Sequence, residues 1–215
     1  MVNQALERSH IAVEGAIGVG KTTLARKLAD RLGSGTLFET TDDNPFIELF
    51  YQDPKRHALA VQLSFLFSRL KQWQGIHQQE LFTTGLVSDY LFAKDRLFAT
   101  LTLSDHELAL YDQVAPLVTA EVPQPDLVIY LQSDPDVIME RIRKRNRPME
   151  RGMTTAYLRE VIAAYDRFFF RYQDTPLLVV QTDRMNFAED PEAVDTLIRR
   201  IRGMRSRTEF WADHS

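Results

Sequence analysis

The sequence predicts an α/β fold in which helices cover both faces of a doubly wound, five-stranded parallel sheet. Short apolar runs alternate with segments of helical periodicity along the whole chain, as in parallel α/β proteins. A glycine-rich loop with the pattern GxxxxGK[ST] directly follows the first apolar run. A length of 215 residues, of which 44% are hydrophobic, suffices for one well-packed core. We therefore expect a single domain over residues 1–215.

Five short apolar runs are the candidate strands, and each is bounded by polar or turn-forming residues. Helical segments between them would act as crossovers and make the strands parallel. The expected strands cover residues 10–14, 35–39, 85–89, 126–131 and 176–180.

The predicted helices separate these strands. The first follows the glycine-rich loop, carries Leu24, Leu28 and Leu32 on one face, and ends near Gly33. Another begins with Asp134 as its N-cap, directly before a proline at the first helical position. The remaining expected helices cover about 54–75, 93–101, 104–121, 154–171 and 191–203.

Composition and charge narrow the class of function. The net charge of −4 argues against nucleic acids or anionic membranes as general partners. No run approaches 18 apolar residues, and the first ten residues hold no apolar segment that could serve as a signal peptide. The absence of cysteine excludes disulfides, thiolate metal sites and thiol nucleophiles. We expect a cytoplasmic enzyme whose partners are small molecules.

The glycine-rich loop is the clearest functional signal. Its glycines let backbone N–H groups approach phosphate oxygens, and the following helix adds its positive dipole end. Lys21 would bridge the β- and γ-phosphates of a nucleotide, and the Thr22 hydroxyl would bind Mg²⁺. A strand before the loop and a helix after it complete the pattern, so we predict a nucleotide-binding site. Its residues are Gly15, Ala16, Ile17, Gly18, Val19, Gly20, Lys21, Thr22 and Thr23.

Other proteins with this loop carry motifs that this chain lacks. A GTPase would need an NKxD guanine-binding motif, which does not occur. The single DxxG, Asp30 to Gly33, lies at the end of the first predicted helix rather than after a later strand. No LSGGQ-like signature of a transporter ATPase is present, and the chain is too short for most motors. Phosphoryl transfer to a small molecule remains.

Two carboxylates end predicted strands. Glu39 ends the second strand and Asp89 the third, so both would lie at the carboxyl edge of the sheet, where such folds bind ligands. A carboxylate there can orient a hydroxyl nucleophile or hold a metal-bound water. The alternative is a pair of solvated strand ends that cap their loops.

A dense basic cluster lies in residues 141–152, with six basic side chains and one acid. Arg141 and Arg145 are four residues apart, as are Arg143 and Arg147, so a helix would present two arginine pairs on adjacent faces. Such a cluster repels itself unless an anion lies among its members, and guanidinium groups suit a triphosphate. We predict a lid over the phosphates; the alternatives are a solvated helix face or a nucleic-acid patch.

Six segments form a larger pattern when they are taken in order: EGAIGVGKTT, FET, NPFIELFYQDP, QLSFLFSRL, SDYLFAKDR and RIRKRNRPMERG. In this order they resemble the deoxyribonucleoside kinase family, specifically its bacterial deoxyadenosine/deoxyguanosine kinase-like branch. The resemblance covers roughly residues 9–190. It implies a P-loop kinase fold, ATP as phosphate donor, Mg²⁺, and a deoxynucleoside that is phosphorylated on its 5′-hydroxyl.

The resemblance also implies roles at the sugar and the phosphates. Glu39 corresponds to the general base that accepts the proton of the 5′-hydroxyl. Tyr51 and Glu150 correspond to the pair that binds the 3′-hydroxyl, and the bulk of Tyr51 beside C2′ would favour a 2′-deoxy sugar. The lid arginines around the phosphates correspond to Arg141, Arg145 and Arg147.

For the base, the resemblance assigns Gln62 and an arginine–aspartate pair, Arg69 and Asp95. A carboxylate at the base edge accepts from an amino or imino group, whereas the O4 of thymine would face it unsatisfied. We expect deoxyadenosine or deoxyguanosine as the best substrate, deoxycytidine as a second candidate, and thymidine as a poor one. Phe46 and Phe92 are candidate stacking walls.

One position departs from many family members, which carry Glu-Arg-Ser after the third strand. That arginine helps to hold the 5′-oxygen and the incoming phosphate. Here the residues are Asp89, Tyr90 and Leu91, as in the bacterial branch. Asp89 can keep the carboxylate role, including a contact to Mg²⁺ through water, but Tyr90 supplies no positive charge. Arg96 or a lid arginine are the candidates to replace it.

Two alternatives remain. A nucleoside monophosphate kinase of the thymidylate kinase type would need a DR[YF] motif after the third strand, and the pair Asp95–Arg96 comes too late to match. An inactive kinase-fold subunit would have lost Lys21, Glu39 or the lid arginines, which are all present.

Because family members are often dimers, we expect a homodimer. The tail, about 204–215, would dock on the body or lie at a subunit contact.

Overall fold

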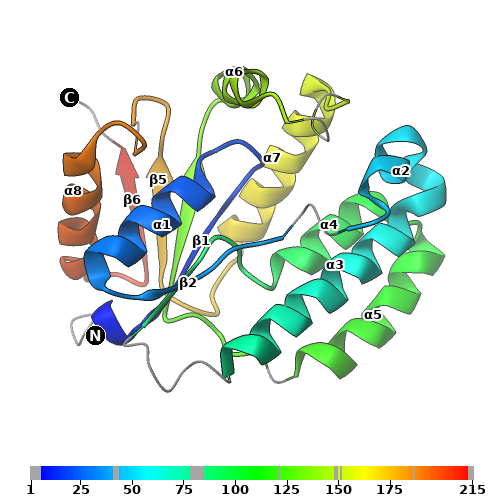
Figure 1. Ribbon diagram of the computed structural model, residues 1–215, viewed down its shortest axis with the longest axis horizontal. Coiled ribbons are helices and arrows are strands. Elements are labelled where there is room, and N and C mark those ends of the chain that lie inside the picture. The colour runs from blue at the N-terminus through cyan, green and yellow to red at the C-terminus, as the bar shows by residue number, and fades with distance from the viewer. Residues whose placement is uncertain are drawn as a thin grey trace.

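The fold was analysed in a computed structural model that describes residues 6–40, 44–77, 85–120, 122–147, 150, 152–185 and 187–212. Within these ranges, parallel strands form one six-stranded sheet in the order β2-β3-β1-β4-β5-β6 (Figure 1). This order reverses direction beside β1, as in a doubly wound sheet, so the predicted fold class is confirmed. The strands are β1 (His10–Gly15), β2 (Gly35–Leu37), β3 (Leu86–Ser88), β4 (Leu127–Gln132), β5 (Leu177–Gln181) and β6 (Thr208–Ala212).

The predicted number of strands was wrong by one, because the tail adds β6. This strand pairs in parallel with β5, with Thr208 opposite Leu177. Trp211 packs against the main core, whereas its neighbour Phe210 is 71% exposed. The segment has only five residues and begins with two polar ones, so its apolar pattern alone is weak. Its position follows from the free main-chain edge of β5, which sequence periodicity does not reveal.

The helices match the predicted segments within a few residues, apart from α2, which was not predicted. Gly33 ends α1 in the left-handed conformation with φ 64°, and Asp134 caps α6 by accepting from the Asp136 amide. The bounds are α1 (Lys21–Leu32), α2 (Ile47–Gln52), α3 (Pro54–His77), α4 (Lys94–Thr102), α5 (Asp105–Thr119), α6 (Pro135–Arg145), α7 (Thr155–Phe170) and α8 (Pro191–Arg202), and a 3-10 turn covers Leu6–Arg8.

The helices lie in layers on the two sides of the sheet (Figure 1). Helices α1 and α8 pack together on one side, and α7 and α4 lie on the other, with α3 and α5 outside α4. Among the described residues, no helix is both long and apolar enough to cross a membrane.

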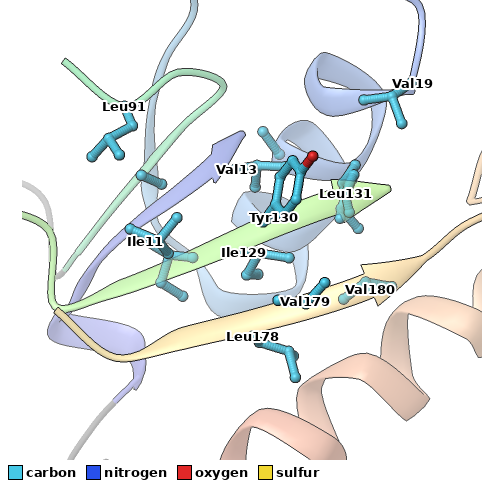
Figure 2. Close-up of a cluster of buried hydrophobic side chains, with 14 of the residues drawn as sticks. Ile11, Val13, Val19, Leu91, Ile129, Tyr130, Leu131, Leu178, Val179 and Val180 are labelled. Carbon is cyan, nitrogen blue, oxygen red and sulfur yellow. The ribbon is translucent and has the colours of Figure 1, made fainter. Parts of the chain in front are cut away.

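The main core lies between these layers and is built on the three central strands β1, β4 and β5. Figure 2 shows side chains of these strands packed together, among them Ile11, Val13, Ile129 and Leu178, which are 0% exposed. Burial on this scale stabilises each large aliphatic side chain by about 1.5–3 kcal/mol relative to exposure. The rigid strands therefore fix the positions of the loops at their carboxyl ends, where the site lies.

Candidate active site

The phosphate loop has the geometry that the motif predicts. It joins the end of β1 to the start of α1, and Gly18 and Gly20 have positive φ angles of 86° and 111°. A Cβ on Gly18 would come within 2.6 Å of the Ile142 side chain, so the loop also needs glycine there for space. Lys21 Nζ donates to the main-chain carbonyls of Gly15 at 2.8 Å and Ala16 at 3.1 Å.

Asp89 ties the end of β2 to the phosphate loop. It is 4% exposed, accepts from the Thr22 hydroxyl at 2.5 Å, and accepts from the Glu39 amide at 2.7 Å. Both predicted strand-end carboxylates therefore line one cavity rather than standing as solvated caps. Thr22 and Asp89 together present oxygen atoms of the kind that Mg²⁺ prefers.

The Glu39 carboxylate is held by two cations from different helices. Arg69 on α3 donates to its Oε1 at 2.9 Å and 2.5 Å, and Lys94 at the start of α4 donates to its Oε2 at 2.7 Å. Burial by itself raises the pKa of Glu39, but Lys94 and Arg69 outweigh burial and hold the pKa well below its usual range. Burial and the nearby Lys94 ammonium lower the pKa of Lys21.

These groups share one cavity of about 170 Å³ with most of the predicted base-reading and lid residues, though not with Asp95 or Arg141. Its wall combines charged and apolar side chains, as small-molecule sites do. Aromatic walls come from Phe50, Phe65 and Phe98 rather than from the expected Phe46 and Phe92. The polar lining residues are Lys21, Thr22, Glu39, Gln62, Arg69, Asp89, Lys94, Thr102, Arg145, Arg147 and Glu150, together with Tyr157 and Tyr165.

The predicted base-reading residues are brought together but differ in their access to the cavity. Gln62 lines it and donates to the Thr102 hydroxyl at 3.1 Å. Arg69 pairs with Asp95, and both are buried, so this pair is not a remote surface ion pair. Asp95 lies behind Arg69, where the Tyr111 hydroxyl donates to it at 2.5 Å, and it is not part of the cavity wall.

The lid differs from the predicted continuous helix. Helix α6 ends at Arg145 because Asn146 adopts a left-handed conformation with φ 50°, so Arg143 and Arg147 do not form a helical pair. Arg145 pairs with Glu150, which is 8% exposed, and Arg145, Arg147 and Glu150 all line the cavity. These three lid residues therefore form part of the cavity wall.

Arg141 lies apart from these lid residues. Its guanidinium donates to the Val19 carbonyl at 3.2 Å and the Thr182 carbonyl at 2.9 Å, which links the phosphate loop to the end of β5. The side chain of Tyr51, predicted to bind the sugar, lies outside the described part of the structure.

Two buried residues of the site were not singled out from the sequence. Lys94 is 3% exposed, and Glu14 on β1 is 0% exposed. Glu14 accepts from the Gly15 amide at 2.9 Å, the Leu91 amide at 2.7 Å and the Tyr165 hydroxyl at 3.0 Å, so it joins the phosphate loop, the loop after β3 and α7. A carboxylate inside an otherwise apolar strand was the signal that could have identified Glu14.

Comparisons with known proteins identify the family of this chain. Residues 11–204 match the family model for deoxynucleoside kinases, so the chain belongs to the deoxynucleoside kinase family and is a kinase. It is 35% identical over 174 residues to the deoxyguanosine kinase of Bacillus subtilis (strain 168). The matched residues make up 80% of this chain and 84% of that kinase. It is 34% identical over 203 residues to the deoxyadenosine kinase of Dictyostelium discoideum, over 91% of this chain and 80% of that one.

A third relative and a solved structure extend the comparison. The deoxyadenosine/deoxycytidine kinase of Bacillus subtilis (strain 168) is 31% identical over 91% of this chain and 92% of its own. The structure of deoxyadenosine kinase from M. mycoides with bound dATP superposes with a TM-score of 0.73 at 24% identity. The superposed residues make up 89% of this chain and 97% of the solved one, so the two share their fold.

Proposed function

We propose that this chain transfers the γ-phosphoryl group of ATP to the 5′-hydroxyl of a 2′-deoxynucleoside and so returns deoxynucleosides to the nucleotide pool. The observation that carries the proposal is one cavity with two functional parts. It places Glu39, a buried carboxylate held by two cations, beside the phosphate-loop residues Lys21 and Thr22. The same cavity has aromatic walls and the amide of Gln62, which suit a nucleoside base.

The reaction assigns one role to each group. The donor phosphates lie in the loop of residues 15–22, where main-chain N–H groups and Lys21 stabilise the charge on the transferred group. The 5′-oxygen attacks the γ-phosphorus, its proton passes to the Glu39 carboxylate, and the bond to the β-phosphate oxygen breaks to release ADP. Arg145 and Arg147 stabilise the same phosphates from the lid and exclude water.

Thr22 and Asp89 are the residues that would hold Mg²⁺, with Asp89 acting directly or through water. Their oxygen atoms meet at the cavity wall, which is the donor chemistry that this ion prefers. The described residues contain no cluster of three or more acidic, histidine or cysteine side chains that could hold a metal. This fits an ion that takes its other ligands from phosphate and water. When bound, Mg²⁺ would neutralise phosphate charge.

A purine deoxynucleoside is the proposed best substrate, with deoxycytidine as a second candidate and thymidine as a poor substrate. Gln62 and Arg69 line the cavity and offer a carboxamide and a guanidinium to the base edge, and Asp95 lies behind Arg69 and pairs with it. A base that leaves such buried polar groups unpaired loses about 1–3 kcal/mol of binding. The names of the relatives, which act on deoxyguanosine, deoxyadenosine or deoxycytidine, support this order.

Glu150, with Tyr51, is proposed to bind the sugar 3′-hydroxyl. Glu150 is buried and lines the cavity, where Arg145 pairs with its carboxylate. The bulk of Tyr51 beside C2′ would disfavour a ribose.

A homodimer is proposed because α3 and α5 expose the apolar residues Phe67, Leu110 and Leu117. We also place the enzyme in the cytoplasm, where ATP is supplied.

A substrate panel tests the proposal. The protein would be mixed with ATP, Mg²⁺ and, one at a time, the four 2′-deoxynucleosides, adenosine and thymidine monophosphate, with release of ADP as the readout. We expect release with deoxyadenosine or deoxyguanosine, less with deoxycytidine, and little with thymidine or adenosine. If only the monophosphate supported ADP release, the chain would be a nucleoside monophosphate kinase instead.

A further inference from the structure

The family resemblance implies a positive charge beside the acceptor oxygen, which neither Tyr90 nor Arg96 provides here. The other expected source is a lid arginine, and Arg145 and Arg147 line the same cavity. Tyr90 is 1% exposed, packs in a side cluster with Leu37 and Trp73, and donates its hydroxyl to Gln72 at 3.2 Å. Arg96 has a side chain that is 63% exposed and pairs with Asp112 at 3.0 Å on the surface. The expectation that Arg96 replaces the family arginine is therefore wrong.

Lys94 is the cation that the structure places there. It is the first residue of α4 and is 3% exposed, yet it lines the cavity with Lys21, Glu39 and Asp89. Its Nζ lies 2.7 Å from Glu39 Oε2. The other oxygen of Glu39 is already bonded to Arg69, so the two cations divide the carboxylate between them.

The backbone explains how a residue four positions after Tyr90 reaches this point. The chain turns directly after β3, where the Leu91 amide donates to buried Glu14 at 2.7 Å and the Lys94 amide donates to the Leu91 carbonyl at 3.1 Å. The turn directs the Tyr90 side chain into the side cluster and the Lys94 side chain into the cavity. The cation in the cavity thus comes from Lys94, four positions further along the sequence than Tyr90.

A buried ammonium is costly unless its donors are satisfied. Lys94 has three N–H donors. Among the described residues its ammonium donates to Glu39 and lies 5.6 Å from the centre of the Tyr90 ring. Arg69 differs, because its guanidinium lies between two carboxylates, those of Glu39 and Asp95. Lys94 therefore retains donors for an oxygen atom that enters the cavity next to Glu39.

We propose that Lys94 is a catalytic residue that donates a hydrogen bond to the 5′-oxygen and its incoming phosphoryl group while it holds the Glu39 carboxylate in place. The inference rests on the proposed function. As the new O–P bond forms and the bond to the leaving ADP breaks, the hydroxyl proton goes to Glu39, and Lys94 keeps its protons throughout. Its charge is most useful when negative charge develops on the transferred oxygens.

The test compares Lys94→Met, Lys94→Gln and Lys94→Arg with the wild type, and uses Arg96→Met as a control on the same helix. We expect Lys94→Met and Lys94→Gln to lower kcat by about 10²-fold or more, as the loss of one such donor does elsewhere. We expect the KM for the deoxynucleoside to change by less than about threefold, because the base and sugar contacts remain. Lys94→Arg should keep more activity than either, and Arg96→Met should match the wild type.

A pH profile separates this role from a structural one. Lys94 is one of the two cations that lower the pKa of Glu39, and the reaction needs the ionised carboxylate, so its removal should move the acid limb of kcat/KM to higher pH. Arg69, Asp89 and Lys21, the other charged groups that face Glu39, are unchanged in these variants. A purely structural role would lower the thermal midpoint and leave this limb in place.

The outcomes are distinct. Lys94→Met or Lys94→Gln with a kcat within about threefold of the wild type would overturn the proposal and leave the proposed function intact. If Lys94→Met does not fold, Lys94→Gln and Lys94→Arg decide by the same criterion. If the wild type phosphorylates no deoxynucleoside, the proposed function fails, and the role of Lys94 fails with it.

Discussion

At the residue scale, Glu39 shows how the surroundings define a chemical role. A carboxylate that is buried alone has a raised pKa, yet Lys94 and Arg69 reverse this effect and keep the pKa of Glu39 well below its usual range. Glu39 thus stays ionised across the physiological pH range and is ready to accept a hydrogen bond from a hydroxyl. A loose phosphoryl-transfer transition state needs such orientation more than a strong base.

Replacing Glu39 with glutamine tests this role. Glu39→Gln should lower kcat by about 10²-fold or more while the deoxynucleoside still binds, because general-base assistance is typically worth 10²–10⁴. Steady-state kinetics and calorimetric binding of the nucleoside provide the measurement, and the thermal midpoint controls for loss of the two ion pairs. Full activity in this variant would transfer the role to Asp89.

The same scale shows what the sequence could not reveal. The phosphate-loop motif contains Lys21 and Thr22, and the predicted strand ends are Glu39 and Asp89. Their presence in one site could therefore be predicted. Lys94 carries no such signal, because a lysine at the start of a helix is usually solvated. Only the turn after β3, held by Glu14, brings it into the cavity.

At the element scale, regular periodicity was predictable and its interruptions were less so. Helices α1 and α8 have clear apolar stripes and end near the expected residues. Helix α2 has only six residues, too few for periodicity to identify. Helix α6 stops at Asn146, although the basic run continues beyond it, because a single left-handed residue ends a helix whatever charge pattern follows.

Helices α3 and α5 also carry the prediction about assembly. Leu117 on α5 is 82% exposed, so a homodimer through this face would bury it. Leu117→Asp should convert a dimer to a monomer in size-exclusion chromatography with light scattering, because a buried unpaired charge destabilises an interface. The matched control is Phe170→Asp on α7, which is 91% exposed and should leave the mass unchanged. A monomeric wild type would exclude the dimer.

At the scale of the whole molecule, the distribution of charge matters more than its sum. The chain has a net charge of −4, yet the lining of one cavity has more cations than anions. The cations are Lys21, Arg69, Lys94, Arg145 and Arg147, and the anions are Glu39, Asp89 and Glu150. Such a concave cationic site concentrates an anionic nucleotide in spite of the overall acidity. The sheet makes this possible, because the ends of β1, β2 and β3 converge where the strand order reverses.

The most direct test of the whole account is the position of the phosphate in the product. The wild-type protein would be incubated with ATP, Mg²⁺ and the deoxynucleoside that it turns over fastest, and the product would be examined by ³¹P NMR. The account predicts a single monophosphate ester whose phosphorus couples to the two protons on C5′, with one ADP formed for each ester. A phosphate on the 3′-oxygen, or ADP formed only when a nucleoside monophosphate is supplied, would contradict it.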